Sequence, residues 1–170
     1  MSSGDLETVL AWRNHPEIRR YMLNGDLIGI DEHRAWFARA SSDRSRILLI
    51  IEEEAVPFGF AQFGDIDSHG VAEWGFYVRP DAKKSSGRKL AFCALRYVFE
   101  KVGLRKVCGR VIENNVASIA FHKMIGFREE GVIAGNGLRD DPSRALILFG
   151  LDRGDWESER LIHGSKNANN

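Results

Sequence analysis

The chain of 170 residues has the length of one ordinary domain, and a domain of this size can bury enough surface to fold without disulfides or metals. Hydrophobic residues make up 44% of it and charged residues 28%, with 24 basic and 24 acidic side chains, which excludes a disordered chain and disfavours nucleic acid as a partner. It has no signal-peptide pattern, no apolar run near the ~20 residues of a spanning helix and no zinc-type cysteine spacing, so we expect a cytoplasmic protein that binds neither membrane nor metal.

The first part of the chain predicts helices. Asp5 stands where it can cap a helix that begins at Leu6, and Pro16 ends or redirects that helix. We expect a further helical turn over residues 17–22 and then another helix capped by Asp31. The domain is therefore expected to open with helices rather than with a strand.

The middle and end of the chain predict a sheet with intervening helices. Apolar runs over residues 47–51, 58–63 and 73–78 predict three antiparallel strands, the last ending at Pro80. The later pattern predicts, in order, a helix over 90–102, a strand over 106–112, a helix over 118–124 and a strand over 145–151. We therefore expect one α/β domain over residues 1–154, followed by a polar segment over 155–170 that ends in a mobile tail.

A basic segment with hydroxyl side chains lies between the third strand and the helix after it. The N-terminus of a helix directs backbone N–H groups and the positive end of the helix dipole at an anion, and Lys and Arg side chains suit a pyrophosphate. The alternative interpretation of this segment is a solvated basic turn with a glycine bend. The candidate ligands are Lys84, Ser85, Ser86, Gly87, Arg88 and Lys89.

A second pattern follows the strand over residues 106–112. Asn115 precedes the helix, Ser118 and His122 lie at i and i+4 on one of its faces, and Gly126-Phe127 follows its end. A helix with an Asn cap and a C-terminal glycine is common, but it does not by itself require the preceding strand and basic segment. The two patterns together therefore indicate a ligand site shared by these helices.

These motifs resemble the GCN5-related N-acetyltransferase (GNAT) superfamily, in Val78-Arg79-Pro80, the basic segment and Asn115 with Gly126-Phe127. The resemblance implies a GNAT fold, with a central mixed, mostly antiparallel sheet flanked by helices, and acetyl-CoA as cofactor. The basic segment over residues 84–89 corresponds to the family's pyrophosphate loop, and we call it the phosphate segment. The chain departs from the family in having a single glycine, Gly87, in this segment, and no strand before the first helix. The cofactor contacts that the resemblance implies are Phe76, Tyr77, Val78, the six residues Lys84 to Lys89, Asn115, Ser118 and His122.

A finer resemblance comes from Trp12-Arg13-Asn14-His15-Pro16, Asp31-Glu32-His33 and Glu129-Glu130-Gly131, which look like N-acetyltransferases that modify the 4-amino group of UDP-linked sugars in pseudaminic acid synthesis. It implies an amino-sugar nucleotide as substrate, with Arg13, His33 and Trp36 as substrate-binding residues and a monomer or homodimer as the working form. The alternatives are a protein N-terminal acetyltransferase of the ribosomal-protein type and a non-catalytic acyl-CoA-binding protein.

In this superfamily the substrate amine attacks the thioester directly, so the protein must deprotonate the amine, hold the oxyanion and protonate the thiolate. The resemblance implies that backbone N–H groups over residues 76–78 polarise the carbonyl. His122 stands at the position that often carries a tyrosine acid, with Tyr77 or Tyr97 as alternatives. Glu73 or Glu113 is the expected base.

Overall fold

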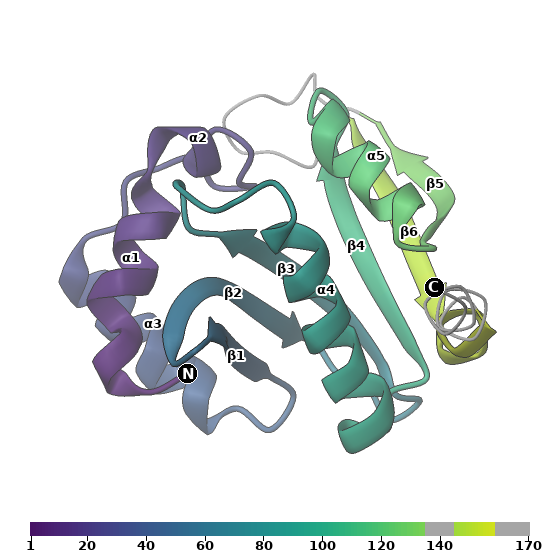
Figure 1. Cartoon of the computed structure of the whole chain (residues 1–170), viewed down its shortest axis with the longest axis horizontal. Helices are drawn as coiled ribbons and strands as arrows, with labels where there is room; N and C mark the ends of the chain where they lie inside the picture. The colour runs from purple at the N-terminus through teal and green to yellow at the C-terminus, as the bar shows by residue number, and fades with distance from the viewer. Residues whose placement is uncertain (135–144, 159–170) are drawn as a thin grey trace.

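The computed structural model describes residues 1–134 and 145–158 as an α/β domain (Figure 1). Its helices and strands, in chain order, are η1 (Ser3–Asp5), α1 (Leu6–Asn14), α2 (Pro16–Arg19), α3 (Ile30–Ser42), β1 (Ile47–Glu53), β2 (Val56–Gly64), β3 (Val71–Val78), α4 (Ser86–Arg96), η2 (Tyr97–Val102), β4 (Lys106–Ile112), α5 (Val116–Met124), β5 (Arg128–Ile133) and β6 (Leu146–Asp152). The expected order of helices and strands is confirmed up to α5. The expected tail lies outside the described residues.

The sheet has six strands in the order β1-β2-β3-β4-β6-β5. Neighbouring strands run antiparallel except for β3 and β4, which are parallel. The expectation of a mixed, mostly antiparallel sheet is therefore confirmed. The expectation of five strands is wrong, because it misses β5, an edge strand whose residues are all exposed except half-buried Gly131 and which lacks the alternating apolar pattern.

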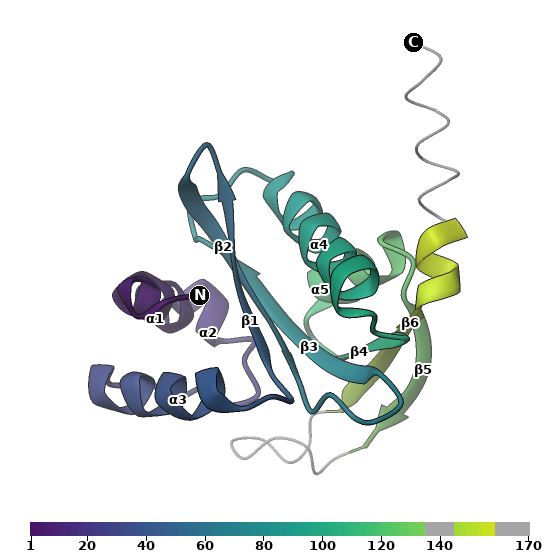
Figure 2. The ribbon, with the colours of Figure 1, turned by 90° about the horizontal axis from the view of Figure 1, so that it is seen from below.

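Helices cover both faces of the sheet (Figure 2). The helices α1, α2 and α3 lie on one face, and α4 and α5 lie on the other, so the domain has three layers. Successive side chains of strand β3 point to opposite helical layers. Trp74 packs on Phe127, which follows α5, whereas the hydroxyl of Tyr77 donates to the carbonyl of Val9 in α1.

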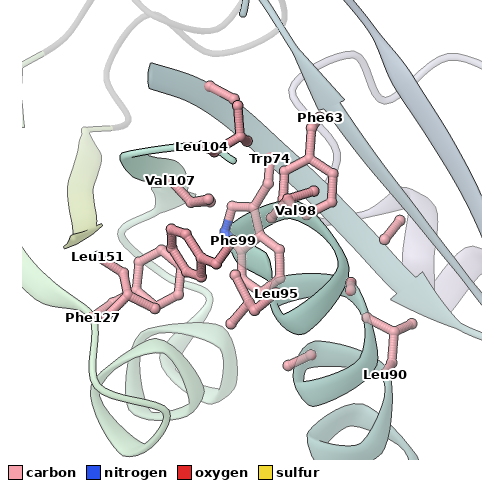
Figure 3. Packing of buried hydrophobic residues seen from close by; sticks show 14 of the residues in the cluster. Phe63, Trp74, Leu90, Leu95, Val98, Phe99, Leu104, Val107, Phe127 and Leu151 are labelled. Carbon is pink, nitrogen blue, oxygen red and sulfur yellow. The ribbon is translucent and has the colours of Figure 1, made fainter. Parts of the chain in front are cut away.

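The core lies between the sheet and the helices α4 and η2 (Figure 3). Helix α4 buries Leu90 and Leu95 on one face, and η2 continues it with Val98 and Phe99. These side chains meet Trp74, Val107 and Leu151 from three strands. The core therefore ties the β3 half of the sheet to the β4 half.

The helix starts differ from the sequence expectation in three places. The N-cap of α3 is Gly29, so Asp31 lies inside the first turn and pairs with Arg34 instead of capping. Asp5 precedes α1 as expected, but its carboxylate accepts from the backbone of Ser2. Helix α4 begins at Ser86, four residues earlier than predicted, because tertiary packing extends a helix into polar sequence that carries no periodic signal. In the part of the chain that the structure describes, no helix has the length and hydropathy needed to cross a membrane.

Candidate active site

The sheet opens between β3 and β4. The parallel ladder pairs Val71 with Lys106 and ends at the pair Trp74 and Gly109, after which the two strands separate (Figure 1). The N–H of Arg79 donates to the carbonyl of Phe58 in the neighbouring β2. Since alternate N–H groups of a strand point in opposite directions, the N–H groups of Phe76 and Val78 face the opening.

A cleft of ≈ 700 Å³ occupies this opening. Its walls come from both helical layers: α2 and the residues after it on one side, and Gly87 of α4 with Asn115, Ser118 and His122 of α5 on the other. Among the residues that the structure describes, its charged lining residues are three arginines and three carboxylates, namely Arg13, Arg46, Arg110, Glu17, Asp65 and Glu73. The formal charges of these described lining residues therefore balance.

On the α5 side of the cleft, the N-cap residue Asn115 fixes the first turn of the helix. The side chain of Asn115 accepts from the N–H of Ser118 at 3.1 Å, as an N-cap residue does. Ser118 and His122 then lie on one face of the helix, with Ser118 Oγ 3.3 Å from His122 Nδ1. Their predicted placement on one helix face is present in the structure, and the contact between the two side chains is an additional finding.

His122 is buried, with 3% of its surface exposed, and both ring nitrogens have partners. Its Nε2 accepts from the indole Nε1 of Trp74 at 3.3 Å, and its Nδ1 lies 2.8 Å from the carbonyl of Ser118. The ring also contacts Phe76, Phe127 and Phe149. This burial lowers the pKa of His122 below its usual 6.5, so the imidazole is neutral at pH 7.

The two candidate bases lie in different surroundings. Glu73 lines the cleft, where its Oε1 accepts from Nε and Nη2 of Arg110, both at 2.7 Å. Glu113 is exposed and its carboxylate accepts from the N–H of Ala145 at the end of the β4 and β6 ladder. The structure therefore brings Glu73, but not Glu113, to the cleft.

The phosphate segment forms the first turn of α4. Its N-cap is Ser85, whose side chain makes no capping hydrogen bond, and Gly87 reaches the cleft. Lys89 pairs with Glu53 at the end of β1, and Arg88 donates to the sulfur of Met124. The N–H groups of the first helical turn are the groups of this segment that could hold an anion, with Lys84 and Ser86 next to them in the chain.

Arg13 is 8% exposed and its guanidinium holds a loop. Its Nη2 donates to the carbonyl of Asn24 at 2.5 Å and its Nη1 to that of Asp26 at 3.2 Å. The neighbouring Asn14 exchanges two hydrogen bonds with the backbone of Ile28. Arg13 lines the cleft, but these contacts make it a residue that shapes the α2 wall.

The other two predicted substrate-binding residues do not line the cleft. His33 is 4% exposed and stacks on Trp36 with ring centroids 5.0 Å apart. Trp36 meets Phe60 edge-on, and Phe60 meets Tyr77, which lines the cleft. We name the rings of His33, Trp36, Phe60 and Tyr77 the aromatic row. In this row, Phe60 and Tyr77 line the cleft, and His33 and Trp36 lie behind them. Burial of Tyr77 raises its pKa.

Trp74, Gly109 and Arg110 were not among the predicted site residues. The sequence places these residues in two predicted strands, over 73–78 and 106–112, and only the parallel pairing of β3 with β4 brings them together. The indole N–H of Trp74 is a hydrogen-bond donor on a predicted strand. A buried indole N–H usually has a hydrogen-bond partner, and this is the sequence signal that could have indicated a polar contact there.

The surroundings fit acetyl-CoA. Backbone N–H groups in the opening suit a thioester carbonyl, and the N-terminus of α4 suits a pyrophosphate. A split sheet of this topology with these donors defines an acetyl-CoA-dependent acyltransferase.

The chain belongs to the GNAT acetyltransferase family, because the family model described as "Acetyltransferase (GNAT) domain" matches residues 1–128. It is 24% identical over 127 residues to "Acetyltransferase PseH" of Campylobacter jejuni, covering 75% of this chain and 79% of that protein. Acetyl-CoA as cofactor and N-acetyltransferase activity are thereby confirmed.

Solved structures with the same fold include a spermidine N-acetyltransferase from Vibrio cholerae in complex with CoA and spermine. It has a TM-score of 0.84 and 20% identity, covering 92% of this chain and 94% of that one. An N-acetyltransferase from Staphylococcus aureus Mu50 has a TM-score of 0.74 and 24% identity, covering 90% and 95%. At these identities the likeness concerns the fold.

Proposed function

We propose that this enzyme acetylates the primary amine of an amino-sugar nucleotide, the 4-amino group of a UDP-linked sugar being the first candidate. The observation that carries the proposal is the charge balance of the cleft, whose described lining residues include equal numbers of arginines and carboxylates. An acceptor with one ammonium group and its own phosphates needs both signs of charge. The resemblance of the N-terminal motifs, such as Trp12-Arg13-Asn14-His15-Pro16, to N-acetyltransferases of UDP-linked 4-amino sugars supports the same acceptor class.

A polyamine is the second candidate, favoured by the fold shared with the spermidine N-acetyltransferase of V. cholerae. A polyamine carries several positive charges and requires an excess of carboxylates around it. Here Glu73 is paired with Arg110, and Asp65 with Arg46 at 3.7 Å. Since two of the three carboxylates among the described lining residues already have a cation, and only Glu17 remains, the cleft lining favours the amino sugar.

The wall of the cleft suits a flat, partly apolar acceptor. Ile18, Tyr21, Met22 and Leu23 line it from the α2 side, and Tyr77 lines it from the sheet. Sugar rings and nucleobases pack on such surfaces through their apolar faces. A protein N-terminus, the remaining acceptor class, calls for an open groove and is less well matched to this wall.

Glu73 is the proposed base. It lies on β3 one residue before the strands separate, and strand alternation places it on the same face as Tyr77, toward α1. Its carboxylate would take the proton of the attacking amine directly or through a water, and its contact with Arg110 fixes its position at the cleft.

The experiment that tests the acceptor is release of CoA thiol from acetyl-CoA with matched amines. We expect turnover with a UDP-4-amino sugar and at least about tenfold lower kcat/KM with spermidine and with an N-terminal peptide. Faster turnover of spermidine would replace the proposal by the polyamine reading. Calorimetry with acetyl-CoA addresses the non-catalytic alternative, since binding without turnover of any amine would favour it.

A further inference from the structure

The hydrogen bonds of His122 determine which ring nitrogen carries the proton. An indole N–H can only donate, so Nε2 of His122, at 3.3 Å from Trp74 Nε1, is an acceptor without a proton. A backbone carbonyl can only accept, so Nδ1, at 2.8 Å from the Ser118 carbonyl, carries the proton. The two contacts agree on one neutral tautomer, which has no Nε2 proton to give to a leaving group.

The same tautomer directs the hydroxyl of Ser118. Because Nδ1 carries the proton, Ser118 Oγ at 3.3 Å can only accept from it, sharing that proton with the closer Ser118 carbonyl, and the hydroxyl hydrogen must point elsewhere. Among residues 1–134 and 145–158 the structure gives that hydrogen no acceptor. Ser118 lines the cleft, so its hydroxyl is a donor without a partner beside the opening of the sheet.

We propose that Ser118 donates the hydrogen bond that stabilises the departing sulfur of CoA, and that His122 is a positioning residue, fixed by Trp74, that orients the Ser118 hydroxyl. The inference rests on the proposed transfer to an amine, and it gives Ser118 the catalytic contact that the family position of His122 would otherwise supply.

The reaction balances without an acid on the enzyme. The amine nitrogen forms a bond to the acetyl carbon, the carbon–sulfur bond breaks, and its electron pair goes to sulfur. The amine proton passes to Glu73 and then to water, and the thiolate leaves with a hydrogen bond from Ser118 and takes a proton from water. A thiol is a much stronger acid than an amine, so the thiolate is the better leaving group and can depart with a hydrogen bond alone.

The first test determines the tautomer of His122 by NMR of protein that carries 15N-labelled histidine. The measurement is made without acetyl-CoA, so it does not depend on enzyme activity. We expect His122 to show a protonated Nδ1 and an unprotonated, hydrogen-bonded Nε2 at pH 7. A protonated Nε2 would overturn the inference, because His122 could then donate its own proton.

The second test compares turnover of Ser118→Ala with that of His122→Asn and His122→Phe. Ser118→Ala should lower kcat roughly 10- to 100-fold with acetyl-CoA binding by calorimetry unchanged, because the hydrogen bond strengthens as charge develops on sulfur. His122→Asn retains an N–H near Ser118 and should lose less than His122→Phe. Unchanged kcat in Ser118→Ala, or equal losses in both His122 variants, would contradict the inference.

Ser41→Ala is the matched control, since Ser41 is exposed on α3 and its hydroxyl donates to its own helix at the carbonyl of Ala38. It should leave kcat unchanged. The comparison uses whichever amine in the acceptor panel gives the fastest turnover. An enzyme that turns over spermidine alone would thus refute the amino-sugar proposal and still test Ser118, and one inert with every amine would refute both.

Discussion

Trp74 and Gly109 form the last pair of the β3 and β4 ladder, and the indole of Trp74 lies directly over the glycine. A Cβ at Gly109 would stand 3.0 Å from Trp74 Nε1 and 3.0 Å from His122 Nε2. The space beside this glycine is thus filled by the two side chains that hydrogen-bond at the base of the cleft.

Gly109→Ala should therefore displace both rings. We expect a loss of about 1–3 kcal/mol in the free energy of unfolding, as for overpacking in a core, together with lower kcat. Denaturant unfolding measures the first and thiol release the second. Gly154→Ala is the control, because a Cβ at Gly154 meets nothing within 4 Å. Equal stability of the two variants would mean that the rings move aside at no cost.

Gly87→Ala should change stability and cofactor binding in opposite directions. Gly87 has no left-handed φ, and a Cβ there would make an ordinary contact with Phe121 at 3.5 Å. Alanine in a helix is more stable than glycine by roughly 0.5–1 kcal/mol, so Tm should rise. The added methyl group lies at the cleft and should weaken acetyl-CoA binding about 5- to 30-fold, or ~1–2 kcal/mol. Calorimetry showing unchanged affinity would remove Gly87 from the cofactor site.

Arg13→Lys separates loop support from substrate binding. One ammonium cannot reproduce the two guanidinium contacts with the carbonyls of Asn24 and Asp26, so we expect a loss of about 1–3 kcal/mol in stability and a higher KM for the acceptor. The KM for acetyl-CoA should be unchanged. Arg34→Lys, in an exposed ion pair, is the control. A normal Tm with a higher KM for the sugar nucleotide would indicate direct contact of Arg13 with the substrate.

Glu73→Gln should lower kcat by about 10²- to 10⁴-fold with little change in stability, since glutamine still accepts from Arg110 but cannot take a proton. Initial rates over a range of pH measure the effect. Glu129→Gln, which removes a surface partner of Lys123, is the matched control and should keep the wild-type rate. A Glu73→Gln enzyme with normal kcat would assign the base elsewhere.

Stability should fall in mild acid. Burial lowers the pKa values of His33 and His122 below 6.5 in the folded protein. The unfolded chain therefore binds protons first as the pH falls through about 6.5, and each histidine removes up to about 1.4 kcal/mol per pH unit until its folded-state pKa is reached. Denaturant unfolding from pH 8 to 5 should show this slope, reduced in His33→Gln.

The sequence predicted the elements with strong apolar periodicity and missed those without it. Strands β1 to β4 and helix α4 carry buried faces that leave a clear pattern, whereas β5 is an exposed edge held by its ladder with β6. The polar residues Ser86 to Lys89 predict a loop. In the structure, packing of the later turns of α4 extends the helix through them.

The site was predictable where its signals are local. The cap at Asn115 and the spacing of Ser118 and His122 follow from helix geometry. The indole partner of His122 and the arginine partner of Glu73 depend on which strands pair, and no local pattern gives that pairing. The resemblance implied that His33 and Trp36 bind the substrate, but both side chains lie one layer behind the cleft wall.

The aromatic row connects helix α3 to the cleft. Trp36 on α3 packs on Phe60, and Phe60 packs on Tyr77 at the cleft, with ring centroids 6.3 Å and 5.2 Å apart. Because close-packed rings transmit a change of volume to their neighbours, a smaller side chain at Trp36 should let Tyr77 move back and widen the cleft. A substitution on α3 can therefore change the shape of the cleft from a position behind its wall.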